Sequence, residues 1–447
     1  MANSYLSRTP SSTGNRRTFT FSTWLKRGSN FGSEMGIFTG GDDANATGFF
    51  TFYITTNDRI DAHFWNGSSF DSVAPNAVLR DPSAWYHLVC AVDTTQSTAS
   101  DRIKIYINGE LQTSMYSTDY PDLNHEFNVN HTSIMQVGVR RNGSGALAGY
   151  FDGYMSHAVL VDGAALTPTS FGETDSTSGI WKFKSPSGVT WGTNGFHLKF
   201  ENSAALGTDS SGNSNTFTVN GNLKQALDTP SNVYCTMNPL QETGPGQAVT
   251  YSFGNTKVAG NWNHWQRVFG TIGATKGKWF YEFKNLQDDG SAGHCRIGWD
   301  SIDFINMTSS GQSSYYSGLT LDREGKLRGG ISGHSGYDPN AVQMTAAHSG
   351  GNFSFTANDI LGMAIDLDNE TFSVYKNGNL EINAYSYAGL SNNSISKSRG
   401  FFIAPSYNWY STSSNNNRSC FNFGNGYFET TAITSAGSNG NGSLFEY

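Results

Sequence analysis

The chain has 447 residues and a formal net charge of −8 at pH 7; 37% of its residues are hydrophobic, 14% aromatic and only 14% charged. Globular domains usually contain about 25% charged residues, so the composition disfavours long amphipathic helices, which need more Glu and Lys. The negative charge argues against a nucleic-acid backbone as partner. The aromatic content and the 51 Gly are typical of antiparallel β-proteins.

The sequence contains no targeting or membrane-spanning pattern. Its first residues lack the apolar core of a signal peptide, and no apolar run reaches about 18 residues. We therefore expect synthesis in the cytoplasm and no membrane insertion. The four cysteines, Cys90, Cys235, Cys295 and Cys420, are far apart, and three lie in apolar runs, which predicts buried reduced thiols.

Alternating apolar residues predict strands from the start of the chain. Residues 18–26 place Phe19, Phe21 and Leu25 on one face and Trp24 on the polar face. Further strand-like runs follow at 85–89, 103–107 and 151–155. Short strands with closely spaced turn signals predict a β-sandwich or jelly roll.

One phrase occurs in both halves of the chain: YINGEL at 106–111 and YKNGNL at 375–380. An Asn-Gly pair between alternating runs is the strongest short signal for a two-residue hairpin, because both turn residues need positive φ. We therefore predict hairpins at Asn108-Gly109 and Asn377-Gly378, in two sandwiches of related architecture.

The predicted fold class is all-β, with two antiparallel jelly-roll sandwiches in tandem. The first domain covers residues 1–235, as a core at 1–170 and an extension at 171–235 that is rich in Ser, Gly and Asn. A linker at 236–247 contains Asn238-Pro239 and Gly244-Pro245. The second domain covers residues 248–447.

Motifs in each half are those of known families. The first half contains WYHLV at 85–89, Asp93, IYING at 105–109, FDG at 151–153 and LTP at 166–168, with LGTDSSGN at 206–213 as a trailing element. With these motifs it resembles the laminin-G-like branch of the concanavalin A-like lectin and glucanase superfamily. The second half contains, in this order, GKWFYEF at 277–283, RIGW at 296–299, DILGM at 359–363, VYKNG at 374–378 and NFG at 422–424. That order resembles SPRY domains, which are concanavalin-like sandwiches themselves.

The tandem of these two domains further resembles virion proteins of marine tailed bacteriophages. This resemblance implies a structural protein of the virion, made in the host cytoplasm, in contact with other virion proteins and assembled as a homo-oligomer. It implies a tail fibre, spike or surface appendage that binds a host glycan or envelope component. Two alternatives stay open: a capsid or tail decoration protein that contacts only virion proteins, and a peptide-binding SPRY adaptor.

The sequence offers no catalytic constellation. Glycosidases use two carboxylates, about 5 to 5.5 Å apart in retaining enzymes. The nearest approach is Glu173 and Asp175, in a turn rich in Ser and Thr and without the third acid of a Glu-x-Asp-x-x-Glu strand. No HExxH, GxSxG or P-loop motif occurs, and the histidines lack metal-ligand spacing. We predict a binding protein that is not an enzyme.

A glycan site needs an aromatic ring against the C–H face of a sugar, with amides or carboxylates for the hydroxyl groups. In the first domain the candidates are Trp24, Trp65, Asn66 and Tyr86; the alternative for each ring is packing within the sandwich. We predict no obligatory cofactor. The laminin-G resemblance implies that a calcium ion could bind at loop acids, here the paired Asp42 and Asp43, which turn chemistry alone also explains.

In the second domain the SPRY resemblance implies ligand binding at loops. The candidates are aromatic residues whose Asn and Ser neighbours are typical of adaptable recognition surfaces: Trp262, Trp265, Tyr315, Tyr316, Trp409 and Tyr410. The alternative is that these rings are buried against the first domain or a neighbouring subunit.

Overall fold

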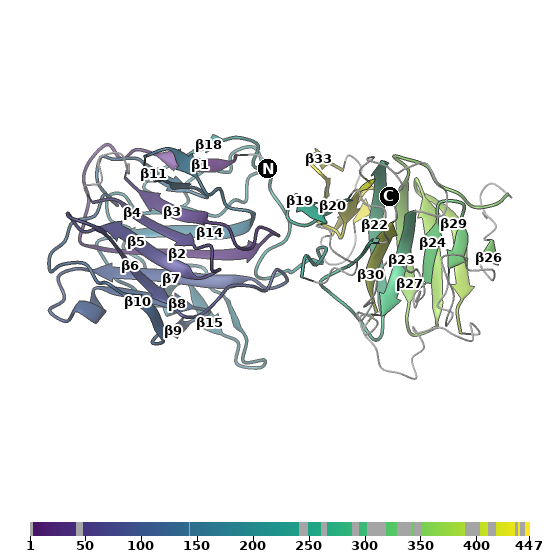
Figure 1. Cartoon of the computed structure of the whole chain (residues 1–447), viewed down its shortest axis with the longest axis horizontal. Coiled ribbons are helices and arrows are strands. Elements are labelled where there is room, and N and C mark those ends of the chain that lie inside the picture. Colours follow the sequence, from purple (N-terminus) through teal and green to yellow (C-terminus); the bar gives the residue numbers. More distant parts are fainter. Residues whose placement is uncertain are drawn as a thin grey trace. The chain divides into compact units, whose positions relative to one another are not determined.

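The computed structural model (Figure 1) describes residues 3–41, 48–142, 144–240, 249–260, 266–287, 295–301, 319–328, 342–343, 351–388, 403–409, 417–433, 437–438 and 443–447. The chain divides into two compact units, Met1–Val233 and Tyr234–Tyr447. Both are built from antiparallel strands, and the helical segments within the described ranges are the short 3-10 turns η2 (Ala99–Asp101) and η3 (Pro168–Ser170). Within those ranges, no helix has the length and hydrophobicity needed to cross a bilayer.

The first unit is a sandwich of two sheets. The β4 sheet has the strand order β10 (Met115–Thr118), β6 (Phe70–Pro75), β5 (Ile60–Trp65), β4 (Phe50–Ile54), β3 (Met35–Gly40), β11 (Met135–Val137), β1 (Tyr5–Arg8) and β18 (Thr218–Asn220). The β2 sheet has the order β17 (Phe196–Leu198), β14 (Gly153–Asp162), β2 (Thr18–Arg27), β7 (Tyr86–Asp93), β8 (Ile103–Ile107) and β9 (Glu110–Leu111). Two short hairpins accompany them: β12 (Arg140–Arg141) with β13 (Leu147–Ala148), and β15 (Gly172–Thr174) with β16 (Trp181–Phe183).

The alternation read from residues 18–26 places the core of the first unit correctly. Phe19, Phe21 and Leu25 are fully buried between the sheets. Phe21 stacks on Phe38 of the opposite sheet, with ring centroids 4.4 Å apart. The β2 sheet is also buried on its other face, where Val89, Val159, Val161 and Phe171 form a second apolar cluster. Part of the extension, including Val189 and Trp191, packs against that cluster.

Both Asn-Gly hairpins are confirmed. Asn108 and Gly109 have φ angles of 51° and 87°, and they join β8 to β9 through the pair Ile107 and Glu110. Asn377 and Gly378 have φ angles of 49° and 82°, and they join β28 (Thr371–Lys376) to β29 (Asn379–Ser386). The two turns lie in different sheets of different units, as the repeated phrase predicts.

The second unit is also a two-sheet sandwich. Its β22 sheet has the order β19 (Thr250–Ser252), β20 (Lys257–Gly260), β31 (Asn417–Asn422), β22 (Lys278–Gln287), β27 (Ile360–Asp366), β28 and β29. Its β23 sheet has the order β21 (Gln266–Phe269), β30 (Ile403–Trp409), β23 (Cys295–Ser301), β24 (Leu319–Asp322), β25 (Lys326–Arg328) and β26 (Val342–Gln343). Two further hairpins pair β32 (Tyr427–Phe428) with β33 (Thr431–Ala432), and β34 (Gly437–Ser438) with β35 (Leu444–Phe445).

The segment expected to be a linker begins with residues that pair inside the second unit. The backbone N–H of Asn238 donates to the carbonyl of Phe269 at 2.7 Å, and Met237 forms a bridge with Gly270. Residues 241–248 lie outside the described ranges. The cysteines agree with the sequence prediction, because all four are reduced thiols and Cys90, Cys295 and Cys420 are buried.

Candidate functional site

The β5–β6 hairpin carries a compact polar turn. The backbone N–H of Asn66 donates to the carbonyl of Ser69 at 3.0 Å, and the Asn66 Oδ1 atom accepts the backbone N–H groups of Ser68 and Ser69, each at 2.9 Å. The Asn66 amide nitrogen donates to the carboxylate of Asp71, and Gly67 at φ 109° completes the turn. One predicted site residue, Asn66, is therefore held rigidly by its own turn.

Three rings flank this turn on the outer face of the β4 sheet. Trp65 and Phe70 lie directly opposite each other across the hairpin, with ring centroids 4.9 Å apart and planes at 69°. His63 stacks on Phe70 at 5.0 Å. Phe70 is 39% exposed, whereas Trp65 and His63 are half-buried. We name His63, Trp65, Asn66, Phe70 and Asp71 the β5–β6 platform.

The platform combines the two kinds of group that a saccharide requires. The Phe70 and Trp65 rings offer apolar, partly exposed surface, and the turn at the end of the same hairpin holds the amide of Asn66 and the carboxylate of Asp71. Asp71 pairs with buried Phe64, so its carboxylate lies on the other face of the strands from the two rings. Sequence reasoning selected Trp65 and Asn66 but missed Phe70 and Asp71. The sequence contained a signal for Phe70. Trp65 and Phe70 flank the four residues 66–69, and the residues that flank such a turn lie opposite each other in a hairpin.

The sheet beneath the platform is nearly neutral. Burial raises the pKa of Asp61 to about 7, although Ser72 Oγ donates to its carboxyl at 2.9 Å. Burial, with Arg140 nearby, lowers the pKa of His63 to about 4, so this imidazole is uncharged at pH 7. Arg140 pairs with Glu34 and lies over the Tyr53 ring at 4.6 Å. This face therefore favours an uncharged ligand.

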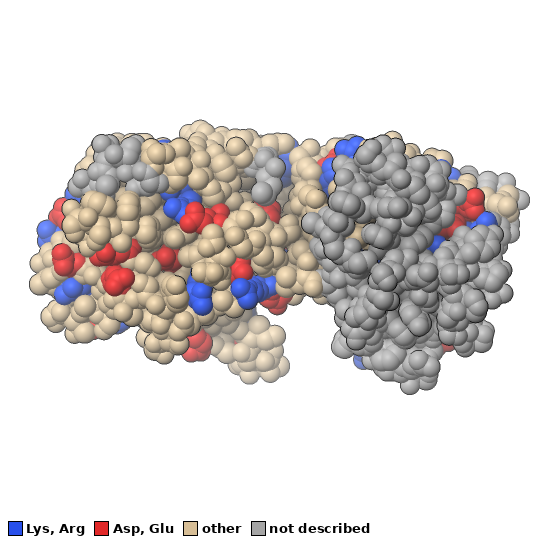
Figure 2. Space-filling model, viewed as in Figure 1, with Lys and Arg blue, Asp and Glu red and all other residues tan. Residues whose placement is uncertain are grey.

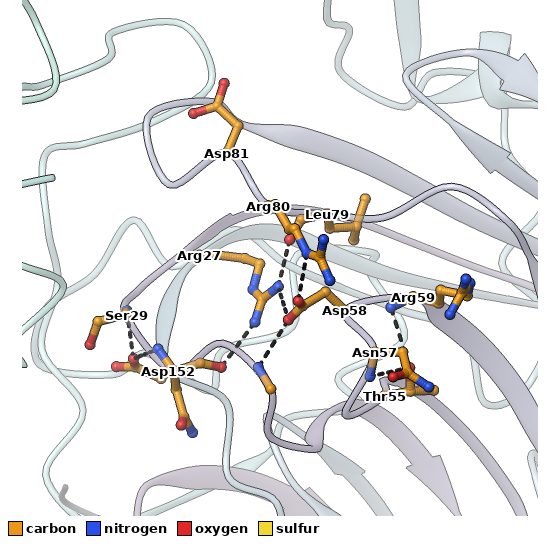
Figure 3. A network of polar contacts seen from close by, with 12 residues as sticks. Arg27, Ser29, Thr55, Asn57, Asp58, Arg59, Leu79, Arg80, Asp81 and Asp152 are labelled. Atoms are coloured by element: carbon orange, nitrogen blue, oxygen red, sulfur yellow. Dashed lines mark hydrogen bonds and ion pairs between the residues drawn. The ribbon is translucent and has the colours of Figure 1, made fainter. Parts of the chain in front are cut away.

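A buried arginine fixes loops of the same unit (Figure 3). The Arg27 side chain, which is fully buried, donates to Asp58 at 2.9 Å and to the carbonyls of Asn30 and Leu79. Arg80 donates to the second oxygen of Asp58 at 2.8 Å. Burial opposes ionisation of Asp58, but the bonds from Arg80 and Arg27 hold its pKa below the usual value. The network is a structural clamp whose charges are satisfied within it.

Trp24 and Tyr86 do not join the platform. Trp24 is 4% exposed and stacks on His87 at 4.7 Å, because the extension covers the outer face of the β2 sheet. Trp181 Nε1 donates to His87 Nδ1 at 3.0 Å, and Ser22 Oγ lies 2.9 Å from His87 Nε2. His87 is thus a buried histidine whose two ring nitrogens both have hydrogen-bond partners. The Tyr86 hydroxyl accepts the backbone N–H of Asp81.

Trp409 is not the loop residue that its Asn and Ser neighbours suggested. It lies in β30, opposite Gln266 of β21 and Cys295 of β23, and it is fully buried. Its ring stacks on Tyr407 at 4.9 Å within the core. A ring that both neighbouring strands enclose cannot contact a partner on the surface. This correction removes Trp409 from the candidate site.

The other candidates lie outside the described residues: Trp262, Trp265, Tyr315, Tyr316, Tyr410, Asp42 and Asp43. The calcium site and the loop site of the second unit therefore stay predictions. Within the described ranges, no three His, Cys, Asp or Glu side chains are grouped to hold a metal ion.

The two carboxylates considered for catalysis lie on the β15–β16 hairpin. Lys182 pairs with both, at 3.4 Å to Glu173 and 3.1 Å to Asp175. Backbone hydrogen bonds from Ser178, followed by the Lys182 contact, lower the pKa of Asp175 well below its usual value. A carboxylate stabilised in its ionised form does not suit the role of general acid.

Known proteins resemble the chain at the level of solved structures and of one family model. Two solved structures resemble the chain at 15% sequence identity each. The SPRY domain of human HERC1 covers 41% of this chain and 96% of its own, with a TM-score of 0.30. The heptameric SAP-like pentraxin from Limulus polyphemus covers 36% and 71%, with a TM-score of 0.27. The comparison with curated proteins found no match. Over residues 2–171, the chain matches a laminin G-type family model described as the concanavalin A-like lectin/glucanases superfamily.

Proposed function

We propose that the chain is a non-enzymatic glycan-binding protein of a bacteriophage surface appendage, a tail fibre or spike, and that the β5–β6 platform contacts the sugar. The observation that carries this proposal is the pair of partly exposed rings, Trp65 and Phe70, at the end of a hairpin whose turn contains the polar groups of Asn66 and Asp71. The superfamily match of residues 2–171 supports a lectin-like role for this unit.

The charge distribution favours a neutral polymer over a polyanion. Figure 2 shows acidic and basic residues of the first unit interspersed among wide neutral areas on the visible face. The sheet beneath the platform is nearly neutral at pH 7, because His63 is uncharged and Glu34 pairs with Arg140. A sugar gains from apolar ring contact and oriented hydrogen bonds under these conditions, and the exposed part of the Phe70 ring offers surface for the first.

The test is binding of the purified chain to a panel of bacterial surface polysaccharides. Trp65→Ala and Phe70→Ala should each weaken binding about thirtyfold, the cost of about 2 kcal/mol typical of a hot-spot aromatic. Trp279→Ala is the matched control, since Trp279 is 44% exposed in the second unit. Equal binding by the platform variants and the unmodified chain would refute the assignment.

The absence of hydrolysis is tested separately. Incubation with the polysaccharides that bind should release no reducing ends, because Lys182 holds both Glu173 and Asp175. Release that disappears in Glu173→Gln would show catalysis and contradict this part of the proposal.

The place of the chain on a particle is the finer part of the proposal. Localisation in a reconstructed virion gives the copy number directly. A few copies at a tail vertex would support an adsorption role, whereas hundreds of copies over the shell would favour the alternative decoration role and overturn the appendage assignment.

A further inference from the structure

The first unit contains a cavity of about 460 Å³ that is not part of the β5–β6 platform. It lies between the first half of β14 and the segment 199–231 of the extension. Its volume falls in the usual size range of small-molecule sites, about 300 to 1,000 Å³, which makes it a candidate ligand site.

Two backbone irregularities open the cavity. β17 pairs with β14 only over Ala158–Leu160, and the register of β14 against β2 shifts between Ser156 and Val159. His157 at this bulge has a φ of 52°, and Phe200, just after β17, has a φ of 60°. Non-glycine residues rarely adopt such angles. The chain after β17 leaves the sheet, and the edge at 153–157 faces the cavity.

Hydrogen bonds fix the outer wall of the cavity in place. The Gln225 side chain donates to the carbonyls of Phe200 and Glu201, at 2.9 Å and 2.7 Å. Three residues further on, Asp228 accepts the Lys26 ammonium at 2.8 Å and the Trp85 indole N–H at 2.9 Å. The wall is anchored on both sides of Leu227, so the cavity is preformed and cannot close simply by collapse of the segment.

The lining is apolar on the inside. Phe151, Met155, Phe200 and Leu223 all pack against the core of the sandwich, yet each remains partly exposed toward the cavity or its mouth. Covering such surface with hydrocarbon is favourable. The mixture of thioether, aliphatic and aromatic side chains suits a flexible hydrocarbon chain.

The charged groups of the lining leave an excess of positive charge. Lys26 neutralises Asp228, and Glu201, 70% exposed, lies 3.8 Å from Lys199. Lys224 is exposed and forms no ion pair within the described ranges. The Nδ1 atom of His157 lies 3.1 Å from the Nε2 atom of His197. Burial lowers the pKa of His157 to about 3 and that of His197 to about 4, so neither imidazole adds charge at pH 7. One ammonium is thus left for an anionic head group.

We propose that this cavity binds an aliphatic monocarboxylate of medium chain length, with the chain against Met155 and Phe200 and the carboxylate toward Lys224. The flexible lysine stem lets the ammonium group reach a head group at the mouth while its methylenes cover the chain. The proposal is independent of the glycan assignment, because the cavity lining contains none of the platform residues.

Calorimetric titration of the full chain with decanoate, decan-1-ol and decyltrimethylammonium tests both parts of the proposal. The three ligands share one chain and differ in head-group charge. We expect decanoate to bind at least tenfold more tightly than the cation, with the alcohol between them. Equal affinities, or tighter binding of the cation, would overturn the head-group assignment. Absence of decanoate binding would overturn the site.

Variants locate the binding. Ala226→Trp fills the cavity and should abolish decanoate binding, whereas Ala204→Trp, at an exposed position of the same segment outside the lining, should not. Lys224→Glu changes an exposed residue and does not disturb packing, so it tests the site even where Ala226→Trp fails to fold. It should reduce the preference for decanoate over the cation at least tenfold, and Lys276→Glu in the second unit should leave it unchanged. An unchanged preference in Lys224→Glu would refute the proposal.

A last measurement separates a free carboxylate from a membrane lipid of similar chemistry. The chain should not float with phosphatidylglycerol vesicles, since the cavity has room for one short chain and not for a bilayer surface. If the unmodified chain floats with the vesicles and Ala226→Trp does not, the cavity binds a membrane lipid, and the proposal of a soluble carboxylate is wrong.

Discussion

Replacing Asp228 by Asn removes the carboxylate that anchors the extension to the sandwich of the first unit. The Asp228 side chain is 1% exposed and its partner Lys26 is fully buried, with 2.8 Å between Nζ and Oδ2. Trp85 donates to the second oxygen at 2.9 Å. The ammonium also lies 5.8 Å from the ring centroid of Tyr154. The substitution keeps the shape of the side chain and changes its charge.

The burial of this ion pair sets the expected loss of stability. Removing one partner of a buried ion pair costs about 3 to 5 kcal/mol, because the remaining charge stays desolvated. Asp228→Ala should cost about 1 to 3 kcal/mol more, since the Trp85 N–H then loses its acceptor as well. In the double variant Lys26→Met, Asp228→Asn, both charges are gone. Its stability should lie above that of either Lys26→Met or Asp228→Asn alone. The coupling is the change in unfolding free energy of the double variant minus the sum of the changes in the two single variants.

Hydrogen exchange followed by mass spectrometry resolves where the stability is lost. We expect peptides that cover residues 222–231 to exchange at least a hundredfold faster in Asp228→Asn, the factor that corresponds to about 3 kcal/mol. Asp175→Asn is the matched control, because it breaks an exposed pair with Lys182 at 3.1 Å and should change nothing measurable. Unchanged protection of 222–231 in Asp228→Asn would refute the anchoring role.

Three further predictions concern single residues of known environment. Burial raises the pKa of Asp61 to about 7, so as the pH rises this carboxyl loses its proton in the unfolded chain before it does so in the folded one. Raising the pH from 4 to 8 should therefore lower the free energy of unfolding by about 4 kcal/mol. Urea titrations of Asp61→Asn should not show this loss. Gly109→Ala should destabilise the protein more than Gly212→Ala. Both glycines have positive φ, but of these two only Gly109 would place a new Cβ against a ring, 2.7 Å from a Trp181 carbon. Equal losses of melting temperature in thermal denaturation would contradict this. A thiol reagent should modify half-buried Cys235 well before Cys90, whose pKa burial raises, as peptide mapping over time can show.

The local part of the fold follows from sequence because its causes are local. Asn108-Gly109 and Asn377-Gly378 form the predicted hairpins, since the positive φ of both turn residues depends only on their own chemistry. The burial of Phe19, Phe21 and Leu25 follows from a period of two. These features would survive almost any arrangement of the rest of the chain.

Burial that depends on distant segments could not be read in the same way. Trp24 occupies the polar face of its strand, as predicted, but that face is covered by chain more than 130 residues downstream. Trp181 stacks on His87, on which the Trp24 ring itself stacks. Trp409 is flanked by residues typical of loops, yet β21 and β23 enclose it from both sides. In each case a tertiary contact decides the exposure of a ring, and composition contains no record of it.

The coverage of the β2 sheet on both faces restricts where ligands can bind to the first unit. Among the described residues, two candidate sites lie away from that sheet's covered faces: the outer face of the β4 sheet, with the platform at Trp65 and Phe70, and the cavity beside the edge of β14. The two sites share no residue, so their ligands should respond to different substitutions. Trp65→Ala should weaken polysaccharide binding and leave decanoate affinity unchanged, while Ala226→Trp should do the reverse. If one variant abolished both, the two ligands would share a site or a folding defect, and circular dichroism of that variant would tell which.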